Sequence, residues 1–176
     1  MCYAGLVSML PAQVTLSIMN TNAFAPTTRA HTSETFQFHV PAPMAVAFPL
    51  FGAHRERQWA PDWEPEFIWP SPPTDRSGMV FTVAHGARQA IWVNTDFDPV
   101  AGHVRYISVL PEVMMTVITL QLREHEAGTH VEVRYERTSL NAAADERIRE
   151  LAREDAQAGP EWASQIAKHL ADRPVR

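Results

Sequence analysis

The stretch from Gly78 to Leu140 constrains the fold most, because its apolar and polar residues alternate in five successive runs. Four short separators divide the runs: His-Gly-Ala, Asp-Pro-Val-Ala, Leu-Pro-Glu and Glu-Ala-Gly. A period of two is typical of half-buried strands, and separators this short join neighbouring strands as antiparallel hairpins. The sequence therefore predicts an antiparallel β-meander as the centre of the protein.

A strand and two short helices are predicted ahead of the meander. Residues 35–43 alternate phenylalanine and valine with polar side chains, as a strand does, until prolines end the run. Over residues 43–58 the apolar side chains recur at spacings of three and four, which indicates an amphipathic helix. Pro49 and Gly52 interrupt this segment, so we expect two short helices. A further short run, residues 66–69, precedes the meander.

The period becomes helical after Asn141, whose side chain suits an N-cap. We expect Gly159-Pro160 to kink or split this long C-terminal helix. A meander alone leaves one apolar face open, so the helix has to cover that face. The predicted fold is α+β, a curved antiparallel sheet of about six to seven strands wrapped around the long C-terminal helix, with a short helical pair after the first strand. The helical stripe expected to face the sheet comprises Trp162, Ile166 and Leu170.

The composition suits one globular domain, since the 176 residues are 45% hydrophobic. The net charge of -5 argues against nucleic-acid binding, which normally needs a basic face. Cys2 is the single cysteine, which excludes a disulfide framework within one chain and indicates a reducing, cytoplasmic compartment. No run approaches the ~20 apolar residues of a membrane span. The oligomeric state stays open, with a homodimer as one option.

Residues 1–32 read as a leader ahead of a domain that we expect over residues 33–172. The leader is mildly apolar, but no Lys or Arg precedes Arg29, and a secretory signal needs a basic start. Three interpretations stay open: a weakly ordered leader, an overlong start with Met19 as the true first residue, or a weak signal peptide. We expect residues 1–30 to pack little against the domain, because they show no strong period.

The sequence lacks the motifs that usually carry metal or nucleophilic chemistry. Its eight histidines include no H-E-x-x-H pair, and no cysteine stands near them. Its serines lack the G-x-S-x-G elbow, and its seven glycines lack the G-x-G-x-x-G spacing of a phosphate loop. We therefore expect neither a metal nor a tightly held cofactor, and we assign no catalytic residue.

Four segments, in the order in which they occur, resemble one family. They are VPAPMAVAFPLF, ERQWAPDWEPEF, NTDFDPVAGHVRYISVLP and GTHVEVRYERTSLN. With these segments the chain resembles the SRPBCC superfamily, the group of START domains, polyketide cyclases and the birch-pollen allergen, over roughly residues 33–171. The W-x-P-x-W-x-P-x-F pattern, common in bacterial members, is the most specific of the four, whereas the alternating strands are generic.

The resemblance implies the helix-grip fold, with an apolar cavity between the sheet and the C-terminal helix. It implies no single chemistry, because the superfamily includes lipid carriers, cyclases and co-chaperones. Trp59 and Trp63 would then lie near the mouth of the cavity. The alternative is that both rings pack under their loop and only fix how the helices cross the sheet.

The turns decide which side chains face the cavity, because a shift of one residue turns every side chain to the other face. With residues 125–128 as a loop, Leu120 faces Val133. With Pro111-Glu112 as a two-residue turn, Arg105 faces inward, unless it reaches the rim or pairs with an acid such as Asp96. A three-residue turn at the same place would instead bring in Val104, Tyr106 and Ser108.

We expect the protein to bind a small hydrophobic or amphipathic molecule, since apolar walls with few polar groups are typical of ligand sites. The candidate ligand-binding residues are Trp59, Trp63, Phe81, Trp92, Asn94, Arg105, Met114, Thr116, Tyr135 and Trp162. The first alternative is a polyketide cyclase/dehydratase-like enzyme, in which Arg105 would stabilise an enolate and Tyr135 would transfer a proton. The second alternative is an interaction module resembling the activator of the Hsp90 ATPase.

Overall fold

The computed structural model describes residues 28–172. Strand β1 (His31–Val40) begins inside the expected leader, and Ala30 just before it is buried. The Ala30 amide donates to the Asp145 carboxylate at 3.1 Å, which ties the start of the domain to a helix near its end. Residues 1–27 of the leader, including Cys2 and Met19, lie outside the described residues, so the expectations for them remain predictions.

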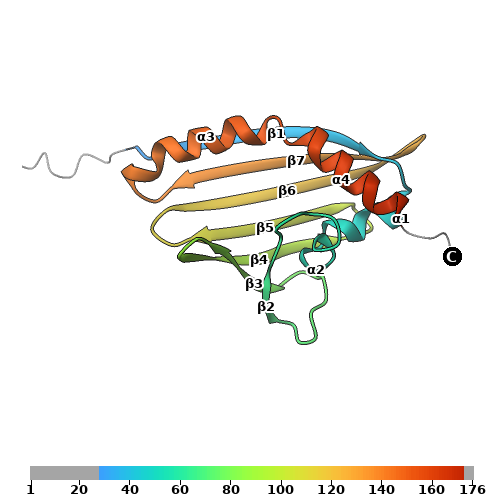
Figure 1. Ribbon diagram of the computed structural model, residues 1–176, viewed down its shortest axis with the longest axis horizontal. Coiled ribbons are helices and arrows are strands. Elements are labelled where there is room, and N and C mark those ends of the chain that lie inside the picture. Colours follow the sequence, from blue (N-terminus) through green and yellow to red (C-terminus); the bar gives the residue numbers. More distant parts are fainter. Residues whose placement is uncertain (1–27, 173–176) are drawn as a thin grey trace, which may run out of the picture.

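The protein is built on a seven-stranded antiparallel sheet with the order β1-β7-β6-β5-β4-β3-β2 (Figure 1). The five predicted runs of the meander are all strands, and each pairs with the next. The first strand, β1, pairs with β7 and forms one edge of the sheet. The strands after β1 are β2 (Glu66–Trp69), β3 (Val80–His85), β4 (Arg88–Asp98), β5 (His103–Leu110), β6 (Met114–His125) and β7 (Gly128–Ser139).

The segment between β1 and β2 contains three short helical pieces instead of the predicted pair. They are α1 (Met44–Ala47), the 3-10 helix η2 (Phe48–Phe51) and α2 (Ala53–Glu56). Pro49 lies in the first turn of η2, where a missing N–H costs nothing, and Gly52 separates η2 from α2. Gly52 is required there for space, since a Cβ would lie 2.2 Å from the Asp75 carboxyl carbon.

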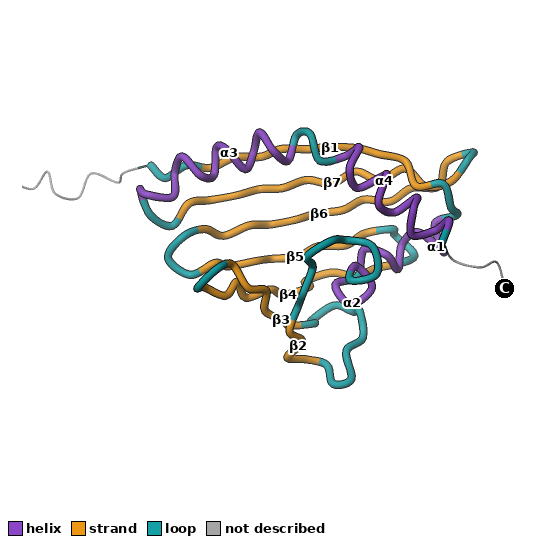
Figure 2. The backbone as a smooth tube through the Cα atoms, in the orientation of Figure 1, coloured by secondary structure: helices purple, strands orange, loops and turns teal. Residues whose placement is uncertain are grey.

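The C-terminal helix is divided in two, as Gly159-Pro160 predicted. After the 3-10 turn η3 (Ala142–Ala144), α3 (Asp145–Asp155) runs beside β1 and α4 (Gly159–Ala171) continues at an angle to it (Figure 2). The Asn141 side chain accepts a hydrogen bond from the Ala144 amide at 3.0 Å, which confirms the predicted N-cap. On α4, Ile166 is completely buried, and Trp162 and Leu170 pack against the core, so the predicted stripe does face the sheet.

A buried ion pair fixes the junction between the two helices. Asp155, at the end of α3, contacts the Arg137 guanidinium of β7, and the two side chains are only 11% and 10% exposed. Burial lowers the pKa of Arg137, and its guanidinium lies 4.4 Å from the centre of the Tyr135 ring. This pair joins the helical layer to the inner face of the sheet beside Tyr135.

The observed registers confirm one end of the predicted inner face and correct the other. Leu120 lies opposite Val133, as expected. The β5–β6 turn has three residues, with Glu112 in the left-handed region at φ 63°, so the two-residue turn was wrong. Arg105 is therefore exposed on the outer face, and Tyr106 is buried on the inner face. The alternative stated for a three-residue turn is the one observed.

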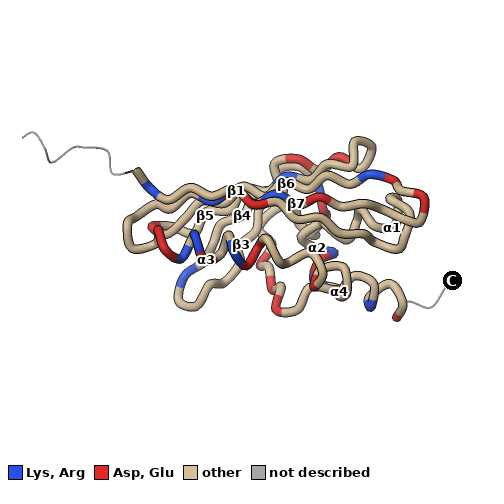
Figure 3. The backbone as a smooth tube through the Cα atoms, turned by 90° about the horizontal axis from the view of Figure 1, so that it is seen from above, with Lys and Arg blue, Asp and Glu red and all other residues tan. Residues whose placement is uncertain are grey.

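The helices lie on one side of the sheet, and the core lies between the two layers (Figure 3). No helix of the described residues has the length and apolar character needed to cross a membrane. The curved seven-stranded sheet with short helices after β1 and a C-terminal helical segment is the predicted α+β arrangement.

Candidate functional site

Aromatic side chains on the inner side of the sheet form two clusters. In the first, which we call the β3–β5 cluster, neighbouring ring centres lie 5.5 to 6.2 Å apart. Its members are Trp63, Phe67, Phe81, Trp92 and Tyr106. In the second, the helix-side cluster, they lie 5.4 to 6.3 Å apart. Its members are Phe36, Phe38, Phe51, Trp59, Tyr135 and Trp162.

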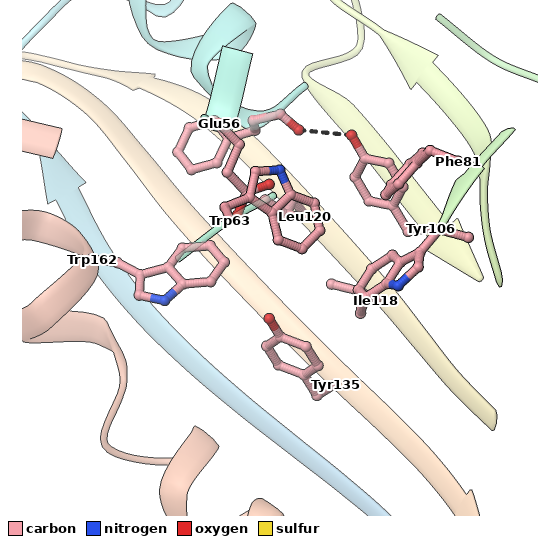
Figure 4. A pocket seen from close by; sticks show the side chains of 10 residues that line it. Glu56, Trp63, Phe81, Tyr106, Ile118, Leu120, Tyr135 and Trp162 are labelled. Carbon is pink, nitrogen blue, oxygen red and sulfur yellow. Dashed lines mark hydrogen bonds between the residues drawn. The ribbon is translucent and has the colours of Figure 1, made fainter. Parts of the chain in front are cut away.

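A cavity of about 50 Å³ lies between these two clusters (Figure 4). It is small, because one water molecule needs about 10–15 Å³, so it holds a few waters or one compact chemical group. Most of its wall is aromatic, and β6 adds two aliphatic side chains. The lining residues are Phe51, Glu56, Trp63, Phe81, Trp92, Tyr106, Ile118, Leu120, Tyr135 and Trp162.

A larger hollow of about 290 Å³, which we call the vestibule, adjoins the cavity. The two spaces share Glu56, Trp63, Tyr135 and Trp162, which therefore form the neck between them. The vestibule is also lined by residues of the loop after α2 and of α4. These are Trp59, Ala60, Pro61, Asp62, Glu161 and Gln165.

Tyr106 fixes the helical segment above the sheet. Its hydroxyl donates to the Phe51 carbonyl at 3.0 Å, drawn as the dashed line in Figure 4, and accepts from the Ala53 amide at 3.0 Å. Burial raises the pKa of Tyr106 well above its ordinary value, and the charges of Glu56 and Asp75 raise it further. The hydroxyl therefore stays neutral and holds both partners across the break between η2 and α2.

Trp59 and Trp63 each have two roles. Each anchors the loop through a hydrogen bond, and each lines a hollow. The Trp59 indole N–H donates to the Leu50 carbonyl at 2.7 Å, and the Trp63 N–H donates to the Ala53 carbonyl at 2.8 Å. Trp59 is buried and packs edge-on against Trp162 at 5.4 Å. Trp63 is half-buried and lines both the cavity and the vestibule.

Glu56 is the one carboxylate among the cavity-lining residues. Its side chain extends from α2 into the pocket, where it lines both the cavity and the vestibule, and the residue is half-buried (Figure 4). Within the described residues its carboxyl group has no hydrogen bond and no ion pair. Burial, and then the charge of Asp75, raises the pKa of Glu56 to about 8. At neutral pH the empty pocket therefore holds a mostly protonated acid.

Asp75 is placed near Glu56 by its contact with the start of α2. Its carboxylate accepts hydrogen bonds from the His54 amide at 2.8 Å and the Arg55 amide at 3.3 Å. Burial raises the pKa of Asp75, while these two amides oppose the rise. The geometry resembles an N-cap supplied from another part of the chain, and it leaves a second negative charge behind Glu56.

Three further polar groups lie in or near the cavity wall. The hydroxyl of Tyr135 points from β7 into the pocket, and burial raises its pKa, with a further rise from the charge of Glu56 (Figure 4). The Trp92 indole N–H is buried without a hydrogen-bond partner among the described residues. Asn94 is fully buried beside Tyr106; its proximity lowers the pKa of that hydroxyl, yet its amide makes no hydrogen bond of good geometry.

The structure brings most of the sequence-predicted residues together. Trp63, Phe81, Trp92, Tyr135 and Trp162 line the cavity. Trp59 lines the vestibule, and Asn94 lies behind the wall.

Three of the predicted residues lie elsewhere. Met114 and Thr116 are on the inner face nearer the start of β6 and do not line the cavity. Arg105 is on the outer face, where it lies opposite Asp96, whose carboxylate instead contacts His103 at 2.6 Å. No enolate-stabilising role for Arg105 is compatible with this position.

Glu56 was missed from the sequence, and Tyr106 was named only in the alternative with a three-residue turn. Tyr106 was placed on the outer face by the two-residue turn. Glu56 was overlooked among the charges of its segment, although it lies four residues after Gly52 and three before Trp59. That spacing places it on the buried side of a helical turn, which was the available signal.

Among residues 28–172, no group of three or more His, Cys, Asp or Glu side chains is arranged to hold a metal ion. The polar groups of the site are instead one acid, two tyrosine hydroxyls and the indole N–H groups of three tryptophans, within an aromatic wall. Such a site can enclose a small apolar group and offer it a few directional contacts.

No known family profile and no curated protein matches the chain in sequence. Its structure is similar to that of an uncharacterised protein from Rhizobium leguminosarum, with a TM-score of 0.59, 16% identity, and coverage of 83% of this chain and 98% of that one. Ara h 8.0201 gives a TM-score of 0.59 at 12% identity, with 82% of this chain and all 100% of that chain covered.

A third similar structure is DynU16, a protein in the dynemicin biosynthetic locus. Its TM-score is 0.54 at 15% identity, and the match covers 80% of this chain but 47% of DynU16. At these identities the likeness concerns the fold and not the chemistry. The chain thus has the helix-grip fold, as its sequence motifs predicted.

Proposed function

We propose that the protein binds one small apolar or amphipathic molecule, with a compact group in the cavity and the remainder in the vestibule. The observation that carries the proposal is the enclosed space between two aromatic clusters, which opens through a neck into a larger hollow. The cavity alone is below the ~300–1,000 Å³ of common ligand pockets, whereas the vestibule adds room of that order.

Polar groups without hydrogen-bond partners indicate that the space between the layers binds a ligand and is not simply an apolar core. Burying a polar group without a hydrogen bond costs free energy. The Trp92 N–H meets that description, and the half-buried Glu56 carboxyl group also lacks a hydrogen-bond partner among the described residues. A bound molecule that supplies their partners recovers part of that cost, which gives both affinity and orientation.

The test is a pair of substitutions at neighbouring positions of β6. Ile118 lines the cavity, while Val117 beside it is on the outer face. An apolar fluorophore should bind the native protein with 1:1 stoichiometry and raise its melting temperature, because it binds only the folded state. Ile118→Trp should abolish binding at an overpacking cost of ~1–3 kcal/mol, and Val117→Trp should leave it intact. Failure of every apolar probe would reject the pocket and favour the interaction module.

A second candidate function is acid–base catalysis on the bound molecule, and Glu56 is the observation that favours it. An acid whose pKa lies near the working pH is suited to proton transfer. Native mass spectrometry of freshly purified protein would show what is bound. A bound compound whose mass changes on incubation with wild type, but not with Glu56→Gln, indicates an enzyme; an unchanged compound indicates a carrier.

A further inference from the structure

The charges around the pocket have one sign. Glu56 lines both the cavity and the vestibule, and Asp62 and Glu161 add two exposed carboxylates to the vestibule. No Lys, Arg or His is among the residues that line either space. Figure 3 shows acidic positions beside the start of α4.

The nearby basic side chains are directed elsewhere. Arg137 is paired with Asp155 behind the Tyr135 ring, and Arg57 pairs with Glu64 at 3.7 Å. Lys168 lines a separate hollow further along α4. An anionic ligand would therefore meet repulsion at the mouth and an uncompensated carboxyl group inside, whereas a cation would be attracted to both.

The aromatic wall also favours a positively charged ligand. Trp63, Trp162 and Tyr135 surround the neck at which Glu56 reaches the cavity (Figure 4). Electron-rich rings attract cations, tryptophan most strongly, and the attraction grows where water is excluded. The small cavity admits a compact cationic head group, and the vestibule admits a larger body.

Building on the proposed function, we propose that the pocket selects a ligand with a substituted ammonium head, held at the neck by the aromatic rings and paired with the Glu56 carboxylate. The Glu56 carboxyl group has no hydrogen-bond or ion-pair partner among the described residues, and an ammonium group would be such a partner. A ligand paired this way needs Glu56 ionised. Binding therefore releases a proton wherever the empty site holds one.

Among the titratable groups around the site, Glu56 is the one that releases this proton. The groups that face it are Asp75 from the loop before β3, Tyr106 from β5, Tyr135 from β7, and Asp62 and Glu161 across the vestibule. Both tyrosines remain neutral, since burial raises the pKa of each.

With the pKa of Glu56 at about 8, affinity for a permanent cation should rise about tenfold from pH 7 to pH 9 and then level. Two imidazoles also lie near the site. They are His54, which packs on Phe67, and His169, beside Lys168.

The experiment compares phenyltrimethylammonium with tert-butylbenzene, which have the same shape and differ in charge. Dissociation constants are measured by calorimetry on the full chain at pH 6, 7, 8 and 9. We expect the cation to bind at least about fivefold more tightly than the neutral probe at pH 9. We also expect its binding at pH 7 to release close to one proton, seen as a heat that depends on the buffer.

Glu56→Gln should remove both the preference for the cation and its pH dependence, while keeping the neutral probe bound. The matched control, Glu161→Gln on the rim, should keep the pH dependence. Equal affinities of the two probes, a flat pH profile, or a profile that survives Glu56→Gln would overturn the cationic ligand and leave the proposed function standing. Loss of binding for both probes and for the apolar fluorophore would reject the proposed function itself.

Discussion

Glu56→Gln should change how the stability of the protein depends on pH, even without a ligand. The carboxyl group moves from an ordinary pKa of 4.5 to about 8 on folding. Because the folded pKa is the higher one, the folded state holds a proton that the unfolded state loses between these values. The stabilisation is therefore fully present below pH 4.5 and is lost as pH rises through 8.

The magnitude follows from the shift. One proton of difference changes the free energy of unfolding by at most about 1.4 kcal/mol per pH unit. From pH 5.5 to 7.5 the wild type should therefore lose up to about 3 kcal/mol relative to Glu56→Gln. That is a large part of the ~5–15 kcal/mol that stabilises a typical domain.

The assay is urea unfolding followed by tryptophan fluorescence at pH 5.5, 6.5 and 7.5. The difference between wild type and Glu56→Gln cancels the titration of histidines, which both proteins share. The two proteins should give the same dependence on urea concentration, so that the comparison reports stability alone. A difference that stays constant within about 0.5 kcal/mol would refute the reasoning, because Glu56 would then ionise as readily in the folded protein as in the unfolded one.

Three other substitutions test the fold and the corrected register. Ile166→Ala should cost about 2–5 kcal/mol in urea unfolding, since Ile166 is fully buried between α4 and the sheet; a cost near zero would place that face in solvent. Asp155→Ala should cost about 3–5 kcal/mol because it leaves the Arg137 charge buried and unpaired, and a melting temperature equal to wild type would contradict that. Arg105→Ala should change stability by less than about 0.5 kcal/mol and leave ligand affinity unchanged, whereas weaker binding would return Arg105 to the inner face.

The parts of the fold that the sequence predicted are those with a strong difference between the two faces. In the β6–β7 hairpin, one face is aliphatic and the other carries Gln121, Arg123, Glu132 and Arg134, so a shift of one residue would bury charges. The pairing of Leu120 with Val133 followed from that contrast. Breakers in the helical segments, such as Gly159-Pro160, were equally direct signals.

The register of β5 could not be read in this way, because both of its faces are partly apolar. Ile107 and Val109 alternate with Val104 and Tyr106, and each set could form a core. The turn decided the matter, with Glu112 in a conformation that glycine or asparagine usually adopts. A bulge between Asn94 and Asp96 shifted the pairing with β4 as well, and nothing in the local sequence marks it.

The tryptophan-rich segment joins the stability of the site to its chemistry. Helix α2 has four residues, too few to be stable alone, so contacts from outside must hold it. Those contacts come from the Tyr106 hydroxyl, the Asp75 carboxylate and the indole N–H of Trp63, while the Trp59 N–H holds the preceding η2 at Leu50. Each of these contacts binds the backbone a few residues from Glu56. The groups that hold the helical segment therefore also position the Glu56 carboxyl group above the sheet.

This arrangement explains why large aromatic side chains lie in an otherwise polar segment. A phenylalanine in place of either tryptophan would keep the ring in the wall but lose the N–H that binds a helix carbonyl. The carboxyl group would then be free to turn toward water, where its pKa returns to the ordinary range. We therefore expect the raised pKa of Glu56 to depend on these two hydrogen bonds, although neither of them involves the carboxyl group.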